Sequence, residues 1–410
     1  MTSPNDGERQ MTIEQVVGEG VALMKAGRYD AAIQLLSLTF LKTKDAERRI
    51  PIYNLIWNLY YTVTPNTVED RSLDYILHIA EGNALRLANR QEEALERYQA
   101  AARANGRLAF SHSLMANALA FLGRYDEAHQ NFARAAERAR GWREGIINLD
   151  AGFLREIIAR PPEAVAVETI GRFIYDDGDL VIVVGCDSRY FRTYAGPMIE
   201  SIRQTCGTAV IIHIHIVDPT PDVLTEVAKR TAADERINVT TERMTETHFV
   251  LETYYACVRF LRMDRIFALY GDAVRYLIFD IDLEVKTDLR PLLDRQAKTD
   301  ITFIRDDTPT ATVWGRYLGG VIHIANPAKA RPFFAAVAQY CEAFYRSPAN
   351  RFLDQIALFA VDANKQVLDI VPTVGAFSEP MVSRNVEDNP PILYFYASQR
   401  PATTLKADEA

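Results

Sequence analysis

Apolar and polar residues follow two different patterns along the chain. Over the first 150 residues Ala and Leu are mixed with Glu and Arg, and no run of β-branched residues occurs, so this part is predicted to be almost wholly helical. From about Asp176, short apolar runs alternate with longer helix-forming segments. That order is typical of a mainly parallel, doubly wound sheet and hence of an α/β fold.

The second part is predicted to contain four strands before its most acidic segment. The strands are residues 180–185, 210–217, 237–240 and 276–279, and the helices between them are residues 194–205, 221–230 and 253–270. Ligands of such sheets bind outside the carboxyl ends of the strands. Asp187 and Asp280 follow the first and fourth strands, so both are expected at that edge.

A 34-residue repeat lies within the helical part. Three pairs recur with that period: Ala84-Leu85 as Ala118-Leu119, Asn89-Arg90 as Gly123-Arg124, and Glu93-Ala94 as Glu127-Ala128. An earlier copy carries Gly27-Arg28-Tyr29-Asp30, which leaves room for a divergent copy around residues 50–77. Each helix pair buries its apolar face by stacking on the next pair. Residues 11–146 therefore resemble tetratricopeptide repeats, which present a concave protein-binding surface; the alternative is an irregular helical bundle.

Composition and charge narrow the class of protein. The 410 residues are 48% hydrophobic and 24% charged, as in globular proteins of two or three domains. Lys and Arg number 46 against 54 Asp and Glu, and this net charge of -8 argues against nucleic-acid binding. The four cysteines are widely spaced, which fits reduced thiols. The polar start shows no signal peptide and no run is long enough to span a membrane, so a cytoplasmic, soluble protein is expected.

The main candidate for chemistry is an acidic pair at the end of the fourth strand. The apolar run 276–279 leads directly into Asp280 and Asp282. On extended backbone, carboxylates at i and i+2 point to the same side. Such a pair suits Mg²⁺ or Mn²⁺ bridging substrate phosphates, whereas the alternative is an exposed pair that accepts hydrogen bonds from loop amides. A buried strand would hold the pair rigidly, which favours the metal site.

Two enzyme classes use a hydrophobic strand that ends in D-x-D. In haloacid-dehalogenase phosphatases the first Asp is the nucleophile, and Asp306-Asp307 could imitate their later acidic motif. Their nucleophile strand opens the domain, however, whereas here about a hundred residues of strands and helices precede Asp280. The order of elements therefore argues against this class.

Five further segments of the sequence match motifs of the second enzyme class, in the correct order. They are Val184-Gly-Cys-Asp187-Ser-Arg-Tyr190, the helix 254–262 with Arg259, Asp288-Leu-Arg-Pro-Leu292, Tyr317-Leu-Gly-Gly320-Val, and Leu353-Asp354-Gln355. From Asp179 to about Pro401 the chain thereby resembles the GT-A glycosyltransferases, most closely glycosyltransferase family 8. The resemblance implies a Rossmann-like mixed sheet and transfer of a hexose from a nucleotide diphosphate sugar, UDP-linked, with retention of anomeric configuration.

The resemblance also assigns roles to individual residues. Asp187 would bind the uracil and Tyr190 would stack on it; Arg259 would lie near the donor diphosphate. Asp280 and Asp282 would hold Mn²⁺ or Mg²⁺, Gly319 and Gly320 would form the strand beneath the sugar, and Asp354 and Gln355 would contact the transferred sugar. The acceptor would be a protein or a glycan, and the helical repeats would recruit a partner or mediate self-association.

Three family positions differ in this sequence. Tyr394 stands where the family has a metal-binding His, and Arg400 stands near its diphosphate-binding Lys. Gly319 lies near the place of the Asn in the motif "F-N-x-G-V". His323 is the nearest substitute ligand, and His248 could approach the acceptor. Cys186, His213 and His215 are expected in the core. The missing His leaves open a catalytically degenerate scaffold protein as the alternative.

The predicted organisation has five parts. They are a disordered N-terminus over residues 1–10, helical repeats over 11–146, a linker helix over 147–176, a GT-A domain over 177–401, and a C-terminal tail over 402–410.

Overall fold

The structure, a computed structural model, divides into two compact units. One unit holds residues 1–145 together with Thr308–Ala311, and the other holds residues 146–307 and 312–410. The described residues are 12–26, 28, 31–32, 35–36, 39, 73–104, 109–138, 143–244, 251–296, 298–309, 311–347, 352–383 and 388–394. Most of the first and the divergent repeat, the predicted disordered start and the predicted tail lie outside them.

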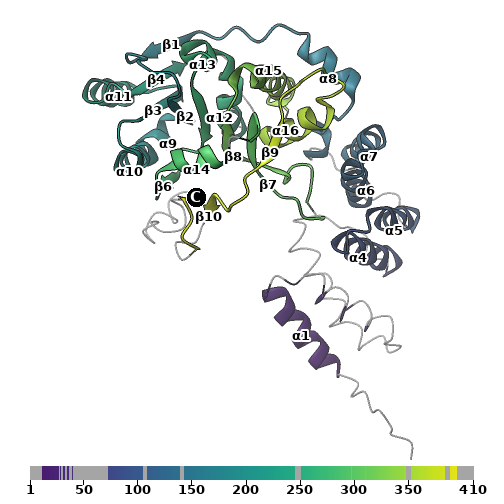
Figure 1. The fold of residues 1–410 in the computed structure, drawn as a ribbon. Helices are drawn as coiled ribbons and strands as arrows, with labels where there is room; N and C mark the ends of the chain where they lie inside the picture. Colours follow the sequence, from purple (N-terminus) through teal and green to yellow (C-terminus); the bar gives the residue numbers. More distant parts are fainter. Residues whose placement is uncertain are drawn as a thin grey trace, which may run out of the picture. The chain divides into compact units, whose positions relative to one another are not determined.

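The part of the first unit before residue 146 that the structure describes is helical. Its helices are α1 (Ile13–Lys25), α4 (Leu73–Leu87), α5 (Gln91–Ala104), α6 (Ala109–Phe121) and α7 (Tyr125–Arg138), followed by the short η1 (Arg143–Ile146) (Figure 1). The turns α4–α5 and α6–α7 both end on a left-handed residue, Asn89 (φ 58°) and Gly123 (φ 75°). In both turns the next residue, Arg90 or Arg124, donates its backbone N–H to the carbonyl five residues earlier. The 34-residue sequence period is therefore a repeat of helical hairpins.

A short segment from the second half of the sequence belongs to this helical unit. Arg86, which is 3% exposed, donates from Nη2 to the carbonyl of Ala311 (2.9 Å), and Gln91 donates from Nε2 to the carbonyl of Pro309 (2.8 Å). The chain leaves the other unit after Asp307 and returns to it at Thr312. Two side chains of the α4–α5 hairpin thus hold the backbone of this segment.

The second unit is built on an eight-stranded mixed sheet of order β1-β4-β3-β2-β5-β8-β7-β9. The strands are β1 (Val167–Ile170), β2 (Leu180–Asp187), β3 (Val210–Val217), β4 (Ile237–Glu242), β5 (Arg275–Phe279), β7 (Ile301–Arg305), β8 (Tyr317–Ile324) and β9 (Val374–Ala376). Strands β4, β3, β2 and β5 run parallel, whereas β8 is antiparallel to both β5 and β7. The mixed α/β fold that the resemblance implies is confirmed, and the sheet is less parallel than the alternation predicts.

Helices cover both faces of the parallel strands. They are α8 (Ala151–Ile158), α9 (Ser188–Tyr190), η2 (Phe191–Ala195), α10 (Gly196–Cys206), α11 (Pro221–Ala233), α12 (Leu251–Leu261), α13 (Met263–Tyr270), α14 (Leu289–Gln296), α15 (Pro327–Phe344) and α16 (Leu353–Asn364). Side chains of α10 and α11 share one core cluster with Ile182, Val184 and Ile214, and in Figure 1 these helices lie to the left of the strands. Every residue of β3 is buried, because both faces are covered.

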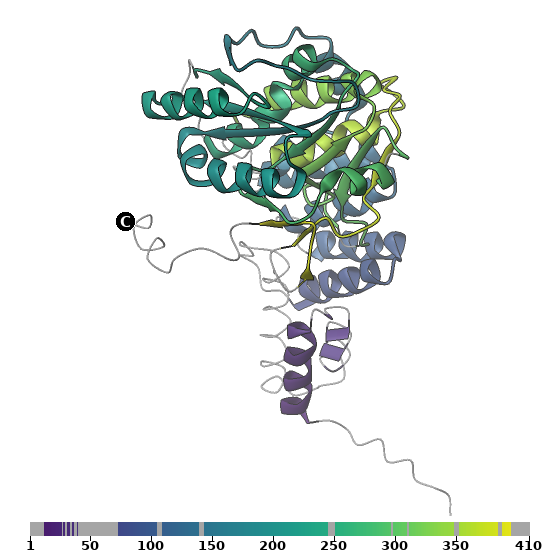
Figure 2. The same cartoon turned by 60° about the vertical axis from the view of Figure 1, so that its left-hand side comes forward.

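A second, three-stranded sheet lies beside the acidic segment. Its order is β10-β11-β6, with β6 (Leu283–Val285), β10 (Val382–Ser383) and β11 (Ile392–Tyr394). Strands β10 and β11 are the yellow arrows in Figure 2. Because β11 pairs with β6, Tyr394 lies opposite Leu283, directly after the D-x-D segment.

Two predicted elements differ from the observed ones. Residues 147–176 contain the helix α8 but also the strand β1, which pairs antiparallel with β4, and Tyr340 accepts a hydrogen bond from the backbone N–H of Asn148 (2.8 Å). This segment is part of the second unit and not a separate linker. The helix predicted over 253–270 is divided into α12 and α13 at Arg262 (φ -107°, ψ 6°).

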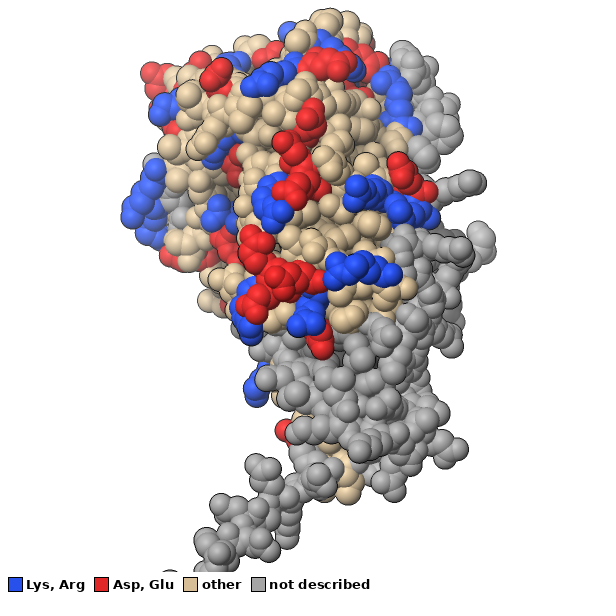
Figure 3. All heavy atoms as spheres, turned by 90° about the vertical axis from the view of Figure 1, so that its right-hand side faces the viewer, with Lys and Arg blue, Asp and Glu red and all other residues tan. Residues whose placement is uncertain are grey.

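Two surface properties follow from the described residues. Among them no helix combines the length and the apolarity needed to cross a bilayer. On the face shown in Figure 3, the described Lys and Arg side chains lie in small groups beside Asp and Glu side chains. The described part of this face therefore lacks the extended region of one sign that would steer a polyanion.

His213 and His215, on β3, lie in the core as expected. His213 hydrogen-bonds through Nδ1 to the Tyr270 hydroxyl (2.9 Å) and through Nε2 to Thr240 Oγ1 (3.0 Å). Burial, with a smaller effect of His215, lowers the pKa of His213 to about 3. The folded protein therefore holds this imidazole neutral at pH values where the unfolded chain binds a proton.

This shift predicts a pH-dependent stability. The contribution of His213 is complete above the unfolded pKa of about 6.5 and is lost as the pH falls towards 3, at ~1.4 kcal/mol per pH unit. Between pH 6.5 and pH 5 we expect the free energy of unfolding to fall by ~2 kcal/mol more in the wild type than in His213→Gln. Urea unfolding at both pH values measures the difference, with His78→Gln, a half-exposed position on α4, as the control. Equal slopes for wild type and His213→Gln would contradict the prediction.

Candidate active site

The candidate site lies at the carboxyl edge of β2 and β5. These strands are neighbours and run parallel, with Val184 opposite Phe279. Asp187, the last residue of β2, and Asp280, the first after β5, therefore come to the same edge of the sheet. Gly185 allows the next layer to approach: a Cβ there would lie 2.8 Å from a methyl of Val258 and 3.3 Å from the backbone nitrogen of Arg259. The absence of a side chain thus brings α12 and its Arg259 down onto this edge.

The D-x-D segment is a turn and not an extended strand. Strand β5 ends at Phe279, residues 281 and 282 form a turn, and β6 starts at Leu283. The backbone N–H of Asp280 donates to the carbonyl of Gly320 (3.0 Å), which joins the turn to β8. The two carboxylates have different neighbours: Asp280 contacts Arg259, while Asp282 acts electrostatically on Tyr190. The expectation of extended backbone through the pair is therefore wrong, since a turn separates β5 from β6.

Arg259 lies between two carboxylates from distant parts of the chain. Its Nη1 forms an ion pair with Asp280, and its Nη2 lies 3.4 Å from Asp354 at the start of α16. The side chains of Arg259 and Asp354 are 6% and 9% exposed, and that of Asp280 is 26% exposed. Burial raises the pKa of Asp354, although the charge of Arg259 opposes this. Arg259 Nε is buried without a hydrogen-bond partner among the described residues, so the guanidinium retains one unused donor.

Two glycines of β8 provide the floor of the site. A Cβ on Gly320 would lie 2.4 Å from Asp280 Oδ2 and 3.0 Å from the Tyr394 hydroxyl. A Cβ on Gly319 would lie 2.8 Å from Asp354 Oδ2 and 3.2 Å from Arg259 Nη2. The pairing of β7 with β8 shifts register here, since Ile304 pairs with Leu318 but Phe303 with Ile322. This bulge is the reason that two successive glycines both meet side chains of the site.

Asp187 and Tyr190 form a second group at the same edge. Asp187 accepts a hydrogen bond from the backbone N–H of Tyr190 (2.7 Å) and so caps α9. Tyr190 is 44% exposed, and its ring lies 5.4 Å from that of Tyr194. Burial raises the pKa of Tyr190, and the charge of Asp282 adds to this. An exposed ring beside two carboxylates is available to a ligand.

Other candidate residues lie elsewhere or have other partners. The side-chain amide of Gln355 is oriented with its nitrogen towards two backbone carbonyls. It donates to those of Trp314 (2.5 Å) and Tyr317 (3.1 Å). His323 pairs in register with Leu277, three residues before Asp280, and feels the charge of Arg275 at the opposite end of β5. It therefore lies roughly 10 Å from the acidic pair and is not a substitute metal ligand. Cys186 is buried. Arg400 and His248 lie outside the described residues.

The acidic residues of the site decide whether it suits a metal ion. No group of three or more His, Cys, Asp or Glu in the described ranges is placed to hold an ion. The candidate site nevertheless contains four carboxylates, compared with the two guanidiniums of Arg189 and Arg259. The carboxylates are those of Asp187, Asp280, Asp282 and Asp354. Mg²⁺ is commonly bound by one or two carboxylates together with substrate phosphates. The acidic surplus fits a divalent cation that arrives with a phosphate-containing ligand.

Comparison with known proteins gives similarity only at the level of solved structures. No protein-family model and no curated protein sequence matches the chain. The bifunctional glycosyltransferase WbbM is 17% identical over 55% of this chain, with a TM-score of 0.38. The match spans 47% of WbbM, about half its length. The galactosyltransferase LgtC is 12% identical over 53% of this chain and 86% of its own, with a TM-score of 0.35. MamA is 19% identical over 36% of this chain and 79% of its own, with a TM-score of 0.18.

Proposed function

We propose that the second unit is a glycosyltransferase of the GT-A class that moves a hexose from a UDP-sugar to a glycan or protein acceptor. The observation that supports this most is the convergence of Asp280, Arg259, Asp354 and the pair Gly319-Gly320 at one sheet edge. These residues come from the turn after β5, from α12, from α16 and from β8. Such a site offers fixed charges, because the missing side chains of the two glycines let the carboxylates of Asp280 and Asp354 lie directly on β8.

Each group of the site has a separate task in this proposal. The ring of Tyr190 stacks on the uracil, and Asp187 accepts a hydrogen bond from it. Loss of the diphosphate leaves an oxocarbenium-like sugar, so charge must be stabilised on the leaving oxygens. Arg259 donates to the leaving phosphate, and Asp354 accepts from a hydroxyl of the sugar. Donors fixed in advance by burial and ion pairs act without reorganisation during the reaction.

A divalent cation is part of the proposal. Asp280 and Asp282 would hold Mn²⁺ or Mg²⁺, which supplies Lewis-acid stabilisation of the diphosphate when it is bound. Tyr394 places a neutral hydroxyl beside Asp280, at the position where the related family has a His. The phenol adds no charge beside Asp280, so an incoming ion would compete only with Arg259 for this carboxylate.

The proposal predicts that the chain releases UDP from a UDP-hexose. We expect release from UDP-glucose or UDP-galactose to rise with Mn²⁺ and to fall at least tenfold in Asp282→Asn. The control is Asp264→Asn, whose side chain is 87% exposed on α13. Coupled detection of UDP measures the rates. A full-rate Asp282→Asn enzyme would remove the metal role.

A degenerate scaffold protein is the second candidate. The ion pair of Arg259 with Asp280 favours it, because this contact already neutralises one of the two proposed metal ligands. A scaffold would release no UDP from any nucleotide sugar, with or without Mn²⁺.

A haloacid-dehalogenase-like phosphatase would release phosphate from aryl phosphates. Asp307, its candidate second motif, forms ion pairs with Arg305 (2.8 Å) and Arg316 (2.6 Å).

A further inference from the structure

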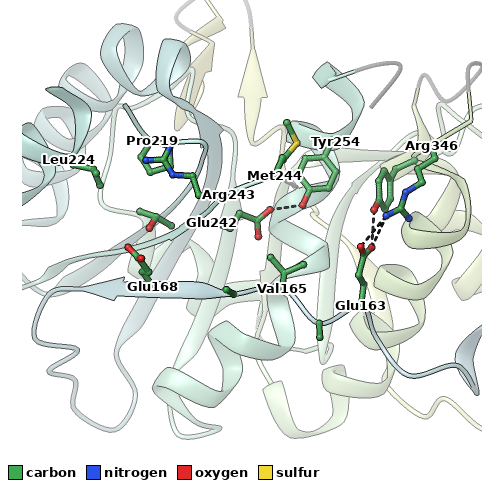
Figure 4. Close-up of a pocket in the computed structure, with 14 residues that line it drawn as sticks. Glu163, Val165, Glu168, Pro219, Leu224, Glu242, Arg243, Met244, Tyr254 and Arg346 are labelled. Atoms are coloured by element: carbon green, nitrogen blue, oxygen red, sulfur yellow. Dashed lines mark hydrogen bonds and ion pairs between the residues drawn. The ribbon is translucent and has the colours of Figure 1, made fainter. Parts of the chain in front are cut away.

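A cavity of about 460 Å³ opens at the carboxyl ends of β3 and β4, within the second unit (Figure 4). Its volume lies in the range of small-molecule pockets. Glu242, the last residue of β4, pairs in register with Val217, and Val217 pairs with Asp187. Glu242 therefore lies two strand spacings, roughly 10 Å, from Asp187. Pro219, also in the lining, lies one strand nearer, since the neighbouring Thr220 donates its backbone N–H to Ser188 Oγ (3.0 Å). The cavity is lined by different residues from those around Arg259.

One wall of the cavity rests on a buried polar network. The Glu242 carboxylate accepts hydrogen bonds from the Tyr254 hydroxyl and from Arg262 Nε, and His215 Nε2 lies 3.2 Å from it. His215 Nδ1 continues the network to Thr240 Oγ1 (2.8 Å). Burial alone would raise the pKa of Glu242, but His215 and Arg262 outweigh it and lower the pKa to about 2. With a side chain that is 0% exposed, this carboxylate fixes Tyr254 and Arg262 in the wall and is itself closed to a ligand.

A second carboxylate is held in the same way on another side. Glu163 accepts hydrogen bonds from the Tyr345 hydroxyl (2.9 Å) and from Arg346 Nη2 (3.0 Å), as Figure 4 shows. Both carboxylates are therefore oriented by one tyrosine and one arginine. Glu163, whose side chain is 41% exposed, is thus the preorganised acceptor of this pair that a ligand hydroxyl can reach.

Two further charged residues of the lining have no partner within the described ranges. The side chains of Glu168, on β1, and Arg243, directly after β4, form neither an ion pair nor a hydrogen bond there. Figure 4 shows both side chains at the end of the cavity near Leu224. They add one free acceptor group and one free donor group.

The charges of the site balance. Three carboxylates (Glu163, Glu168, Glu242) face three guanidiniums, those of Arg243 and Arg346 in the lining and that of Arg262 bound to Glu242. A phosphate would meet as many negative as positive groups. A nucleobase would find no ring to stack on, because Tyr254 and Tyr345 are 4% and 3% exposed. Val165, Pro219 and Met244 offer an apolar surface for C–H groups.

We propose that this cavity binds a neutral saccharide, a mono- or disaccharide unit, at a site separate from the proposed donor site. Alternating acceptors and donors match the hydroxyl groups of a sugar, and the apolar residues match its C–H face. The proposal stands on the cavity and does not depend on the transfer reaction.

The test uses the full chain and four neutral disaccharides, lactose, maltose, cellobiose and sucrose, in ligand-observed NMR and calorimetry. We expect at least one to bind. Ala166→Trp places an indole in the cavity without touching the network and should abolish binding, whereas Ala232→Trp, exposed on α11, should not change it. Glu168→Gln and Arg243→Gln should each weaken binding about tenfold, since hydrogen bonds to charged groups are the stronger ones. Glu200→Gln on α10 is the matched control.

Stabilisation by UDP, measured by thermal unfolding of the same variants, separates the two proposals. Disaccharide binding together with an unchanged UDP effect in Ala166→Trp supports the separate site. Failure of all four disaccharides to bind, or their undiminished binding to Ala166→Trp, overturns it. Loss of the UDP effect in Ala166→Trp also overturns it, because the cavity would then belong to the donor site. A wild type that binds a disaccharide but not UDP would leave this site in place and refute the transferase proposal.

Discussion

Replacing Arg259 by Met is expected to lower the free energy of unfolding by about 3–5 kcal/mol, the cost typical of removing one partner of a buried ion pair. Two carboxylates, Asp280 and Asp354, would then face each other without the guanidinium that separates them. Methionine retains most of the aliphatic packing, so the loss reports mainly on charge. Urea unfolding followed by circular dichroism measures the effect, and UDP release should be lost as well.

The matched control is Arg172→Met. Arg172 forms an ion pair with Glu235 (3.1 Å), but both side chains are more than half exposed. Exposed pairs contribute about 0–1 kcal/mol, so this variant should unfold almost as the wild type does. A similar loss of unfolding free energy in both variants would show that the ion pairs of Arg259 contribute no more to stability than an exposed ion pair does. A further test is Asp354→Asn in the Arg259→Met background, which should recover part of the lost stability by removing one unpaired charge.

Replacing Gly320 by Ala is expected to reduce UDP release at least tenfold and to cost about 1–3 kcal/mol of unfolding free energy, as overpacked positions do. The added methyl would lie 2.4 Å from Asp280 Oδ2, so the carboxylate must rotate away from Arg259. The backbone hydrogen bond between Asp280 and Gly320 limits how far the strand can move. Rate measurements and urea unfolding of the same preparation separate the two effects.

Gly18→Ala adds the same methyl group where nothing lies within 4 Å. It should leave UDP release unchanged and, within α1, should stabilise slightly because Ala favours the helix. Wild-type UDP release by Gly320→Ala would mean that the position of Asp280 does not matter for the reaction. The contact geometry of the glycine pair would then be structural only.

The sequence predicts the parallel strands well, because a strand buried on both faces is a continuous run of apolar residues. Strand β3 is found at the expected residues 210–217, since an unbroken Val and Ile run is typical of a strand buried on both faces. Strand β1 could not be predicted, because Val167–Ile170 is half polar and is defined by its pairing with β4. The break at Arg262 depends likewise on a distant partner, Glu242.

The site shows the same division between local and distant information. The residues predicted around the donor include Asp280, Arg259, Asp354 and the glycine pair, and the structure brings these together. Gly185 and the Glu242 network were missed. A lone glycine in a strand indicates close approach of another backbone, a signal that was available for Gly185. Nothing local marks Glu242, because its partners Tyr254, Arg262 and His215 lie 12, 20 and 27 residues away from it along the chain.

The short segment Thr308–Ala311 determines how the protein can be dissected. A fragment that starts at Ile146 would carry this segment with the carbonyls of Pro309 and Ala311 deprived of their donors. A fragment that ends at Gly145 would leave the guanidinium of Arg86 without its acceptor. Expression of either half by simple truncation would thus create unpaired polar groups on both products, and a usable boundary requires redesign of the β7–β8 connection as well.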